Sequence, residues 1–489
     1  MDGTFAPCPA RPASAAPLLP AAAGARTPPA AGRARLPAWV LLGLLCTACA
    51  SPPRAAERPA APPLAEHWLH AAAGQAADLP AASWWAAFGQ PELAQSVNLA
   101  LHDNPDLAMA VARLRQAEAQ ARQAHAGLFP SLEASLDTTH TRSALSGGGT
   151  QTDTARGLGL QTRYELDLWR RLANLSDAAA ANARASAFDR DAVALSLSAA
   201  TATAWLDSSV LQARAELAGE SLERARRILQ FVTVRRNAGA ASALDVARQQ
   251  TLASAQERLA AELRQRSGET RTRLAVLTGR TPDKLAPRLP DPLGLLPPAL
   301  HAGLPAELLT RRPDIARAEA QLAAADANVA AARAAMLPRL SLSASLSSGF
   351  APISAPLYSL AGGLLAPIFD AGRLDARREE TMAVREALLA AYRATIIDAV
   401  GEVERSLATL AGIEAQHAAQ ARELEAAQLS MRLAEARYRA GAENLQALLD
   451  AQQSMFTAED SRLQLHQARL QANVDLYKAL GGGWRAPSP

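Results

Sequence analysis

Alternation of apolar and polar residues predicts four strands in this chain. In the first of them Leu132, Ala134 and Leu136 occupy every second position and are separated by polar residues. A period of two places the apolar side chains on one face of a strand and the polar side chains on the other. The four segments are Ser131–Asp137, Gly157–Leu168, Leu340–Ser347 and Leu357–Phe369. Flexible loops are expected within each strand pair, from Thr141 to Arg156 and from Gly349 to Pro356.

A very long helix follows each strand pair. The two helices are expected at about Leu172–Arg236 and about Asp375–Arg439, and neither contains proline. At ~1.5 Å per residue, each could extend ~100 Å. Apolar residues recur in them at heptad-like spacing, which is typical of helices that pack on other helices. Alanine at many of these positions favours neighbours on more than one side, and a solvent-exposed coiled-coil rod is the alternative.

The chain is duplicated internally. The stretch beginning at Asn104-Pro105 is followed 208 positions later by one beginning at Arg312-Pro313. Each long helix ends at a glycine, Gly239 or Gly441, before a second helix at roughly Ser242–Leu277 or Asn444–Leu480. Glycine is expected at such a turn between helices. The resulting division is an N-terminal extension with a signal peptide at 1–48, an N-terminal segment at 49–96, a first repeat at 97–281, a Pro-rich linker at 282–305 and a second repeat at 306–489.

Four amphipathic strands of about ten residues have the length of a tilted membrane strand. A sheet can cross hydrocarbon only when it is closed, and the smallest barrels use about eight strands, so several copies of the chain would have to share one barrel. The polar faces would suit a water-filled lumen. They carry Glu133, Asp137, Arg163, Glu165 and Asp167. A soluble sheet with one wet face is the alternative.

The N-terminus has the order of a secretory signal. Arg33 and Arg35 precede the apolar run Leu36–Leu45, and the small residues before Cys49 resemble a bacterial lipobox. We therefore expect Cys49 to be lipidated, which would make 49–96 a lipid-anchored segment. The alternative is an ordinary signal cleaved near Ala48. Because the other two cysteines are Cys8 and Cys46, no disulfide framework or cysteine metal site is expected after Cys49.

Charge and motifs exclude other function classes. The 50 basic and 47 acidic residues are spread along the chain, so no nucleic-acid surface is predicted. There is no Gly-rich phosphate loop, no His-Glu-x-x-His pair and no nucleophile signature, and the eight histidines are scattered. We expect neither catalytic nor metal-binding residues, and hence no enzyme.

From Trp84 to Trp484 the chain resembles the TolC-like outer membrane factors, in particular the efflux lipoprotein branch that serves resistance-nodulation-division pumps. The matching motifs are Trp84-Trp85-Ala86-Ala87-Phe88, Asn104-Pro105-Asp106-Leu107, Tyr164-Glu165-Leu166-Asp167-Leu168-Trp169, Leu309-Thr310-Arg311-Arg312-Pro313-Asp314 and Tyr438-Arg439-Ala440-Gly441. The resemblance implies an α+β membrane protein: a homotrimer whose outer-membrane β-barrel, four strands per chain, continues into a long periplasmic α-helical barrel. The linker and the termini would form an equatorial region around it.

The resemblance also implies a function and its partners. The trimer would be anchored in the outer membrane by the lipid on Cys49, with no other cofactor, and would extend into the periplasm. It would dock onto a periplasmic adaptor joined to an inner-membrane pump and passively conduct small molecules such as drugs or other toxic compounds.

Functional residues are implied at the ends of the two helical hairpins. The tips would contact the adaptor through Gly239 and Ser242 on one hairpin and through Gly441 and Asn444 on the other. Helix capping alone is the alternative for both glycines. Asp450 matches the motif position at which the family places an acidic residue, and copies of that residue form a ring at the periplasmic constriction. Gln446 stands where relatives often carry leucine, and Asp245 is a lesser gate partner that could instead serve the N-terminus of its helix.

Three other functions fit part of the pattern. An export duct for a type I protein secretion system would use the same architecture, and a coiled-coil scaffold lipoprotein would use the helices without a pore. A periplasmic adaptor would also be lipid-anchored, but it would have one hairpin and a lipoyl-like domain, whereas this chain has two hairpins and membrane-type strands.

Overall fold

The computed structural model describes residues 61–70, 83–144, 146–284, 289–298, 300, 302–351 and 355–486. All of them belong to one compact unit, Arg58–Pro489. The predicted signal peptide, Cys8, Cys46 and the lipidation candidate Cys49 lie outside the described residues.

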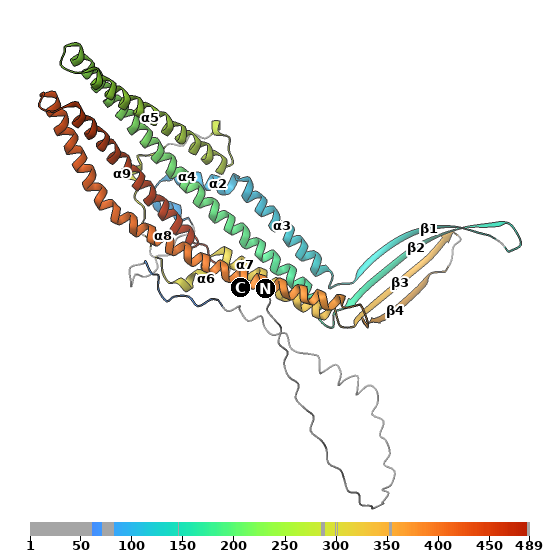
Figure 1. The fold of residues 1–489 in the computed structure, drawn as a ribbon. Coiled ribbons are helices and arrows are strands. Elements are labelled where there is room, and N and C mark those ends of the chain that lie inside the picture. Colours follow the sequence, from blue (N-terminus) through green and yellow to red (C-terminus); the bar gives the residue numbers. More distant parts are fainter. Residues whose placement is uncertain are drawn as a thin grey trace, which may run out of the picture. The chain divides into compact units, whose positions relative to one another are not determined.

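The two halves of the unit contain the same elements in the same order (Figure 1). In the first half these are η1 (Trp84–Phe88), α2 (Pro91–Asp103), α3 (Pro105–Ala126), β1 (Ser131–Ala144), β2 (Thr150–Leu166), α4 (Arg171–Asn237) and α5 (Ala243–Leu277). In the second half they are η4 (Pro305–Glu307), α6 (Leu308–Arg311), α7 (Pro313–Ala334), β3 (Arg339–Ala351), β4 (Leu357–Leu365), α8 (Arg373–Arg439) and α9 (Leu445–Ala479). Three pairs of equivalent helices have equal lengths: 22 residues in α3 and α7, 67 in α4 and α8, and 35 in α5 and α9. The helices α2 and α6, of 13 and 4 residues, differ. The predicted duplication is confirmed.

The four strands form one antiparallel sheet in the order β1-β2-β3-β4. Its register places Ala134 opposite Leu160, Leu160 opposite Leu346, and Leu346 opposite Tyr358. Directly opposed residues share a face, so in the half of the sheet next to the helices one face is mainly apolar across all four strands. The other face contains the serines of β3, of which Ser345 bonds Ser359 at 2.8 Å between hydroxyl oxygens. The predicted alternation is confirmed, and apolar side chains such as Leu360 are 82% exposed in the single chain.

Three strands are longer than the alternation indicated, whereas β4 ends at Leu365, short of the expected end at Phe369. Thr141–Ala144, which we expected in a flexible loop, pairs with Thr150–Asp153 and extends β1, and β2 runs on from there through Arg156. Gly349 also belongs to β3. The expectation was wrong because polar and glycine residues carry no periodic signal, although their backbone groups complete the ladder equally well.

We expected Asp167 on the polar face of β2, but the strand ends at Leu166 and Asp167 follows it. Its carboxylate instead accepts hydrogen bonds from the backbone amides of Leu172 at 3.0 Å and Ala173 at 2.7 Å. Asp370 does the same in the second half, accepting from the amides of Gly372 and Leu374. Each carboxylate satisfies free amides at the start of a 67-residue helix.

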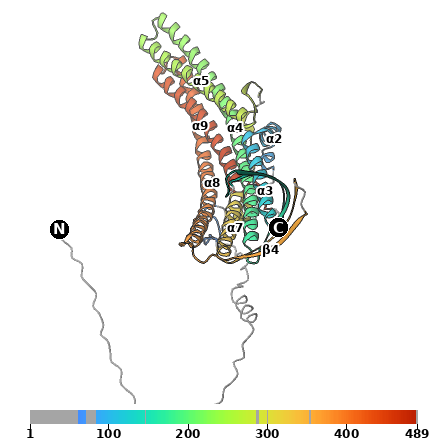
Figure 2. The ribbon, with the colours of Figure 1, turned by 90° about the vertical axis from the view of Figure 1, so that its right-hand side faces the viewer.

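Next to the sheet the helices form a row in the order α3, α4, α7, α8: α4 packs on α3 and α7, and α7 also packs on α8 (Figure 1). Farther from the sheet, α4 pairs with α5 and α8 pairs with α9. These two hairpins lie side by side through α4 and α9, with their turns at the same end (Figure 2).

No helix among the described residues is long and apolar enough to cross a membrane.

The middle of α4 is buried on nearly all sides. Trp205 is fully buried there, in a cluster with Trp84, Leu93 and Leu295. Trp84 also stacks on Tyr477 of α9, with ring centroids 5.1 Å apart. The alanine-rich helix α4 therefore packs against neighbours on more than one side, as its composition indicated.

The Pro-rich linker is part of this packing. Short 3-10 turns lie at Pro282–Lys284, Pro292–Gly294 and Pro305–Glu307. The Ser209 hydroxyl donates to the Pro290 carbonyl at 2.7 Å, and His466 Nε2 donates to the Pro292 carbonyl, also at 2.7 Å. The described linker residues are thus held against α4 and α9.

Candidate functional site: hairpin tips and hairpin roots

Both hairpin tips turn on a glycine and restart on a capped helix. Gly239 has φ +77° and Gly441 has φ +75°, the left-handed conformation that residues with a side chain rarely adopt. Ser242 caps α5 by accepting from the Asp245 amide, and Asn444 caps α9 by accepting from the Ala447 amide. Asparagine replaces the expected hydroxyl residue without loss of the cap, since its side-chain oxygen accepts the same bond.

Asp245 belongs to this cap. Its carboxylate accepts from the Ser242 amide and from the Ser242 hydroxyl, each at 2.8 Å. The backbone hydrogen bond from Ser242 is the main reason that the pKa of Asp245 is lowered from its usual value. The structure therefore gives Asp245 a capping-box role at the start of α5.

Asp450 and Gln446 are brought together on one exposed face of α9. Gln446 Nε2 donates to Asp450 Oδ1 at 2.9 Å. The two residues are four positions apart, so they lie one above the other on the helix. The amide that stands in place of an apolar residue thus orients the carboxylate of the predicted gate.

A cluster that no sequence motif indicated joins the two tips. Val232, Tyr438, Leu445 and Leu448 form a buried group between the hairpins. Arg235 of α4 donates from Nη1 to the Tyr438 carbonyl of α8 at 3.2 Å, and its guanidinium lies 5.1 Å from the Tyr438 ring centroid. Burial raises the pKa of the Tyr438 hydroxyl. Tyr438 stood in a recognised motif, but nothing in the sequence paired it with Arg235.

Ion pairs connect α4 and α9 farther along the hairpins. Arg214 binds Asp460 through two bonds of 2.7 and 3.0 Å. Arg224 donates to Glu459 at 2.9 Å. Burial raises the pKa of Glu459, although the Arg224 charge acts in the opposite direction.

We call the end of a hairpin's second helix, at Leu277 of α5 or Ala479 of α9, the hairpin root. The same arrangement occurs at both roots but is built from different residues. Asn104 Nδ2 donates at 2.9 Å to the carbonyl of Leu277, the last residue of α5. Arg312 occupies the equivalent position and donates at 3.0 Å to the carbonyl of Ala479, the last residue of α9. A carbonyl left free at a helix end is thus bound in both halves.

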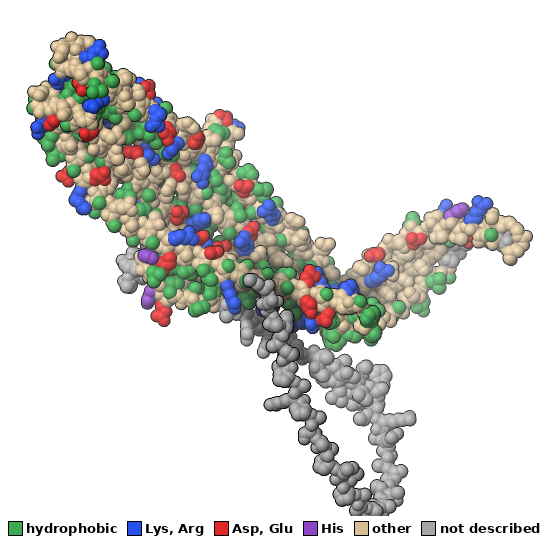
Figure 3. Space-filling model, in the orientation of Figure 1, with side chains coloured by type: hydrophobic (Ala, Val, Ile, Leu, Met, Phe, Trp, Pro, Cys, Tyr) green, Lys and Arg blue, Asp and Glu red, His purple; other side chains and the backbone are tan. Residues whose placement is uncertain are grey.

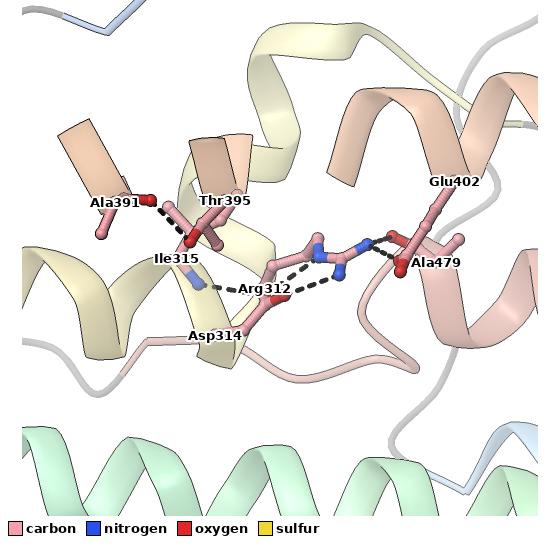
Figure 4. Close-up of polar contacts among 7 residues, drawn as sticks. All are labelled: Arg312, Asp314, Ile315, Ala391, Thr395, Glu402 and Ala479. Carbon is pink, nitrogen blue, oxygen red and sulfur yellow. Dashed lines mark hydrogen bonds and ion pairs between the residues drawn. The ribbon is translucent and has the colours of Figure 1, made fainter. Parts of the chain in front are cut away.

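Arg312 makes further bonds that Asn104 cannot make (Figure 4). Its guanidinium binds Asp314 at 3.0 and 2.6 Å and Glu402 of α8 at 2.7 Å. Burial disfavours charge on Asp314, but the hydrogen bonds and charge of Arg312 outweigh it and keep the pKa of Asp314 below its usual value. The second root therefore connects α7, α8 and α9 through one buried cation.

The described residues contain no group of three His, Cys, Asp or Glu side chains that could hold a metal ion.

On the face drawn in Figure 3, acidic and basic side chains are interspersed along the helices. Hydrophobic side chains gather there where the sheet joins the helices. Ile368 and Phe369, which follow β4, are 92% and 90% exposed.

These features define a channel-type protein: a membrane-type sheet joined to paired helical hairpins with a polar gate candidate at the tips. The sequence model of the outer membrane efflux protein family matches residues 96–280 and 304–482, and this chain belongs to that family. It is an outer-membrane efflux channel and not an enzyme. The scaffold and adaptor alternatives are therefore wrong.

Individual relatives cover nearly the whole chain. The pyoverdine export outer membrane protein OpmQ of Pseudomonas putida is 40% identical over 460 residues, which are 92% of this chain and 97% of that protein. The outer membrane protein OprJ of Pseudomonas aeruginosa is 33% identical over 460 residues, 91% of this chain and 95% of that protein. The solved outer-membrane channel OprN superposes with a TM-score of 0.77 at 29% identity, covering 87% of this chain and 99% of its own.

Proposed function

We propose that three copies of this chain assemble into one duct, the outer-membrane channel of a tripartite efflux system. The main support is the four-stranded sheet, which has one exposed apolar face and is too small to close on itself. Three sheets would make a twelve-stranded barrel with no open edge, and three sets of helices would continue its lumen into the periplasm. Repeats 97–281 and 306–489, joined by the linker 282–305, would each supply a sixth of the wall.

Membership of the family supports two further partners. A periplasmic adaptor would bind the hairpin tips at Gly239, Ser242, Gly441 and Asn444, and an inner-membrane pump of the resistance-nodulation-division class would load the duct. The tip turns are exposed, which suits a docking role. OpmQ is named for pyoverdine export. For this chain we propose that the pump selects the cargo, since a wide, water-filled lumen needs no binding site.

The resting gate would be a ring of three Asp450 carboxylates. Like charges facing one narrow lumen repel one another and attract cations, so neighbouring helices must hold them in place. The bond from Gln446 and the Arg235–Tyr438 contact between the hairpins supply such restraint. Asp245 would act indirectly, by stabilising the start of α5.

Anchoring would be completed by a lipid on Cys49, at the start of the segment 49–96. The mass of the mature protein tests this proposal. A diacyl or triacyl adduct on Cys49 supports it, and an unmodified Cys49 would overturn it.

The function is tested by planar-bilayer conductance of the detergent-purified protein, with the mass of the assembly measured in the same preparation. Discrete channels from a trimer are expected. Asp450→Ala should raise single-channel conductance and weaken block by divalent cations, because it removes the ring charge. Asp283→Ala removes the same charge from the linker and serves as control. Unchanged conductance and block in Asp450→Ala would refute the gate, whereas a non-conducting wild-type trimer would refute the duct.

A further inference from the structure

A small cavity lies between the two helical hairpins of the chain. Its volume is about 140 Å³, and all four hairpin helices, α4, α5, α8 and α9, contribute to its lining. None of the lining residues is exposed. The hairpins that enclose it lie side by side (Figure 2). Because one chain supplies these four helices, the cavity is formed within a single protomer.

The size and the apolar part of the wall suit one aromatic ring. The apolar side chains are Ala225 of α4, Leu252 of α5, Met431 of α8, and Met455 and Phe456 of α9. An apolar cavity of about 150 Å³ accommodates a benzene molecule. Methionine side chains are flexible and polarizable, and their sulfur atoms contact aromatic rings favourably.

The charged groups in the wall already have partners. The Arg224 guanidinium donates to Glu459 at 2.9 Å and to the Ser221 hydroxyl at 2.8 Å. The Glu435 carboxylate accepts from Arg439 at 2.5 Å. A charged ligand would have to compete with these ion pairs, so the wall favours a neutral one.

Two hydrogen-bond acceptors in the wall have no partner. Gln256 of α5 and Gln452 of α9 both line the cavity, and the side-chain Oε1 atom of each is buried without a hydrogen bond. Gln256 is only 5% exposed. A buried carbonyl oxygen that accepts no bond is unfavourable, and a donor group on a molecule in the cavity would relieve this cost.

The cavity lies close to the hairpin tips. Gln452 follows the gate candidate Asp450 by two positions on α9, and Glu435 precedes Tyr438 of the cluster that joins the tips by three positions on α8. A molecule that contacts both hairpins loses contacts when they separate. It therefore stabilises the arrangement in which they lie together.

We propose that this cavity binds a small neutral aromatic molecule with one hydrogen-bond donor, of the phenol class, and that the bound molecule holds the two hairpins together. The ring would lie against Leu252, Met455 and Phe456, and the hydroxyl would donate to Gln256. Binding itself does not require the proposed channel. The consequence for the resting gate rests on the proposed function.

Binding of 4-fluorophenol and fluorobenzene to the detergent-purified protein, measured by fluorine NMR against protein-free detergent, tests the site. Gln256→Leu should weaken 4-fluorophenol binding roughly two- to ten-fold, the range for one hydrogen bond, and leave fluorobenzene binding unweakened. The variant should fold, because it removes an unpartnered polar atom. Gln250→Leu, the same change at an exposed position of α5, is the matched control. Equal 4-fluorophenol affinity in the two variants would overturn recognition by Gln256.

Leu252→Trp fills the cavity and should abolish binding of both probes. Thermal unfolding and the mass of the assembly show whether this variant is intact. Wild-type affinity of both probes in intact Leu252→Trp would place them elsewhere and overturn the site.

Single-channel recording tests the consequence for the gate. At a concentration equal to its Kd, 4-fluorophenol should lower the open-to-closed ratio of wild-type channels about two-fold for each protomer whose hairpins separate, because it binds only the closed arrangement. Leu252→Trp channels should not respond. Binding without any effect on wild-type channels would overturn the link to the hairpins, whereas a wild-type trimer that does not conduct would overturn the proposed function and leave the binding site in place.

Discussion

At the scale of single residues, two glycines allow the hairpin roots to close. Gly279 and Gly481 have φ values of +68° and +89°. A Cβ atom at Gly481 would lie well inside van der Waals contact with the Arg311 carbonyl, and one at Gly279 would meet the Asp103 carbonyl in the same way. Backbone atoms cannot move aside as flexible side chains can, so both positions need glycine.

Gly481→Ala should therefore destabilise the protein by roughly 2 kcal/mol or more, through backbone strain and the clash with Arg311. The measurement is thermal unfolding of the detergent-solubilised protein. Gly412→Ala in α8 is the matched control, because a Cβ there meets nothing within 4 Å. It should be neutral or stabilising by up to about 1 kcal/mol, since alanine is the better helix former. Equal behaviour of the two variants would contradict the role of Gly481.

At the scale of elements, the two halves use different chemistry for the same junction. Asn104 joins α3 to the end of α5 with one neutral bond, whereas Arg312 joins α7, α8 and α9 with charged bonds. Only the second junction should depend on pH. The pKa of Asp314 is lowered in the folded protein, so its stabilising contribution is present above the ordinary carboxyl range and is lost as pH falls through the lowered pKa.

Asp314→Asn should accordingly reduce the free energy of unfolding near neutral pH by about 1–3 kcal/mol, the usual range for hydrogen bonds to charged groups. The deficit should shrink as the pH is lowered through the lowered pKa of Asp314, because the wild-type carboxylate is then protonated too. Thermal unfolding at several pH values measures this effect. Asp283→Asn in the linker should show no such deficit, and a deficit independent of pH would speak against the ionised network.

At the scale of the whole molecule, the two faces of the sheet should meet different environments in the assembled channel. In the half of the sheet next to the helices, the face of Leu360 is mainly apolar across four strands, and the face of Ser359 contains serines and charged residues. If the apolar face meets lipid and the other lines the lumen, a charge is costly only on the first.

Leu360→Asp should prevent stable insertion, because a charged side chain on a lipid-facing strand costs up to roughly 2–4 kcal/mol in each copy. Ser359→Asp, one residue away, should insert normally. The amount of heat-resistant trimer in the outer-membrane fraction distinguishes the two variants. Equal yields would mean that the apolar face does not meet the membrane.

Local signals predicted the elements and the tip caps. Alternation over a few residues identified the strands, and the break at Gly239 identified a hairpin turn. These features depend on neighbours in the chain, so the amino-acid pattern is sufficient. It was insufficient for the polar contacts. Asp167 looked like a strand residue, and its role in capping α4 appeared only when the strand was seen to end at Leu166.

By itself, then, the sequence determined the duplication, the order of strands and helices, the two-faced sheet and the family, since each is a repeated pattern of residue types along the chain. Only the tertiary structure decided which side chains meet. Arg312 and Glu402 are 90 positions apart, and Arg235 and Tyr438 are 203 apart. The physical reason is that an arginine can pair with any carboxylate or carbonyl in the chain, and packing alone selects the one brought within hydrogen-bonding distance.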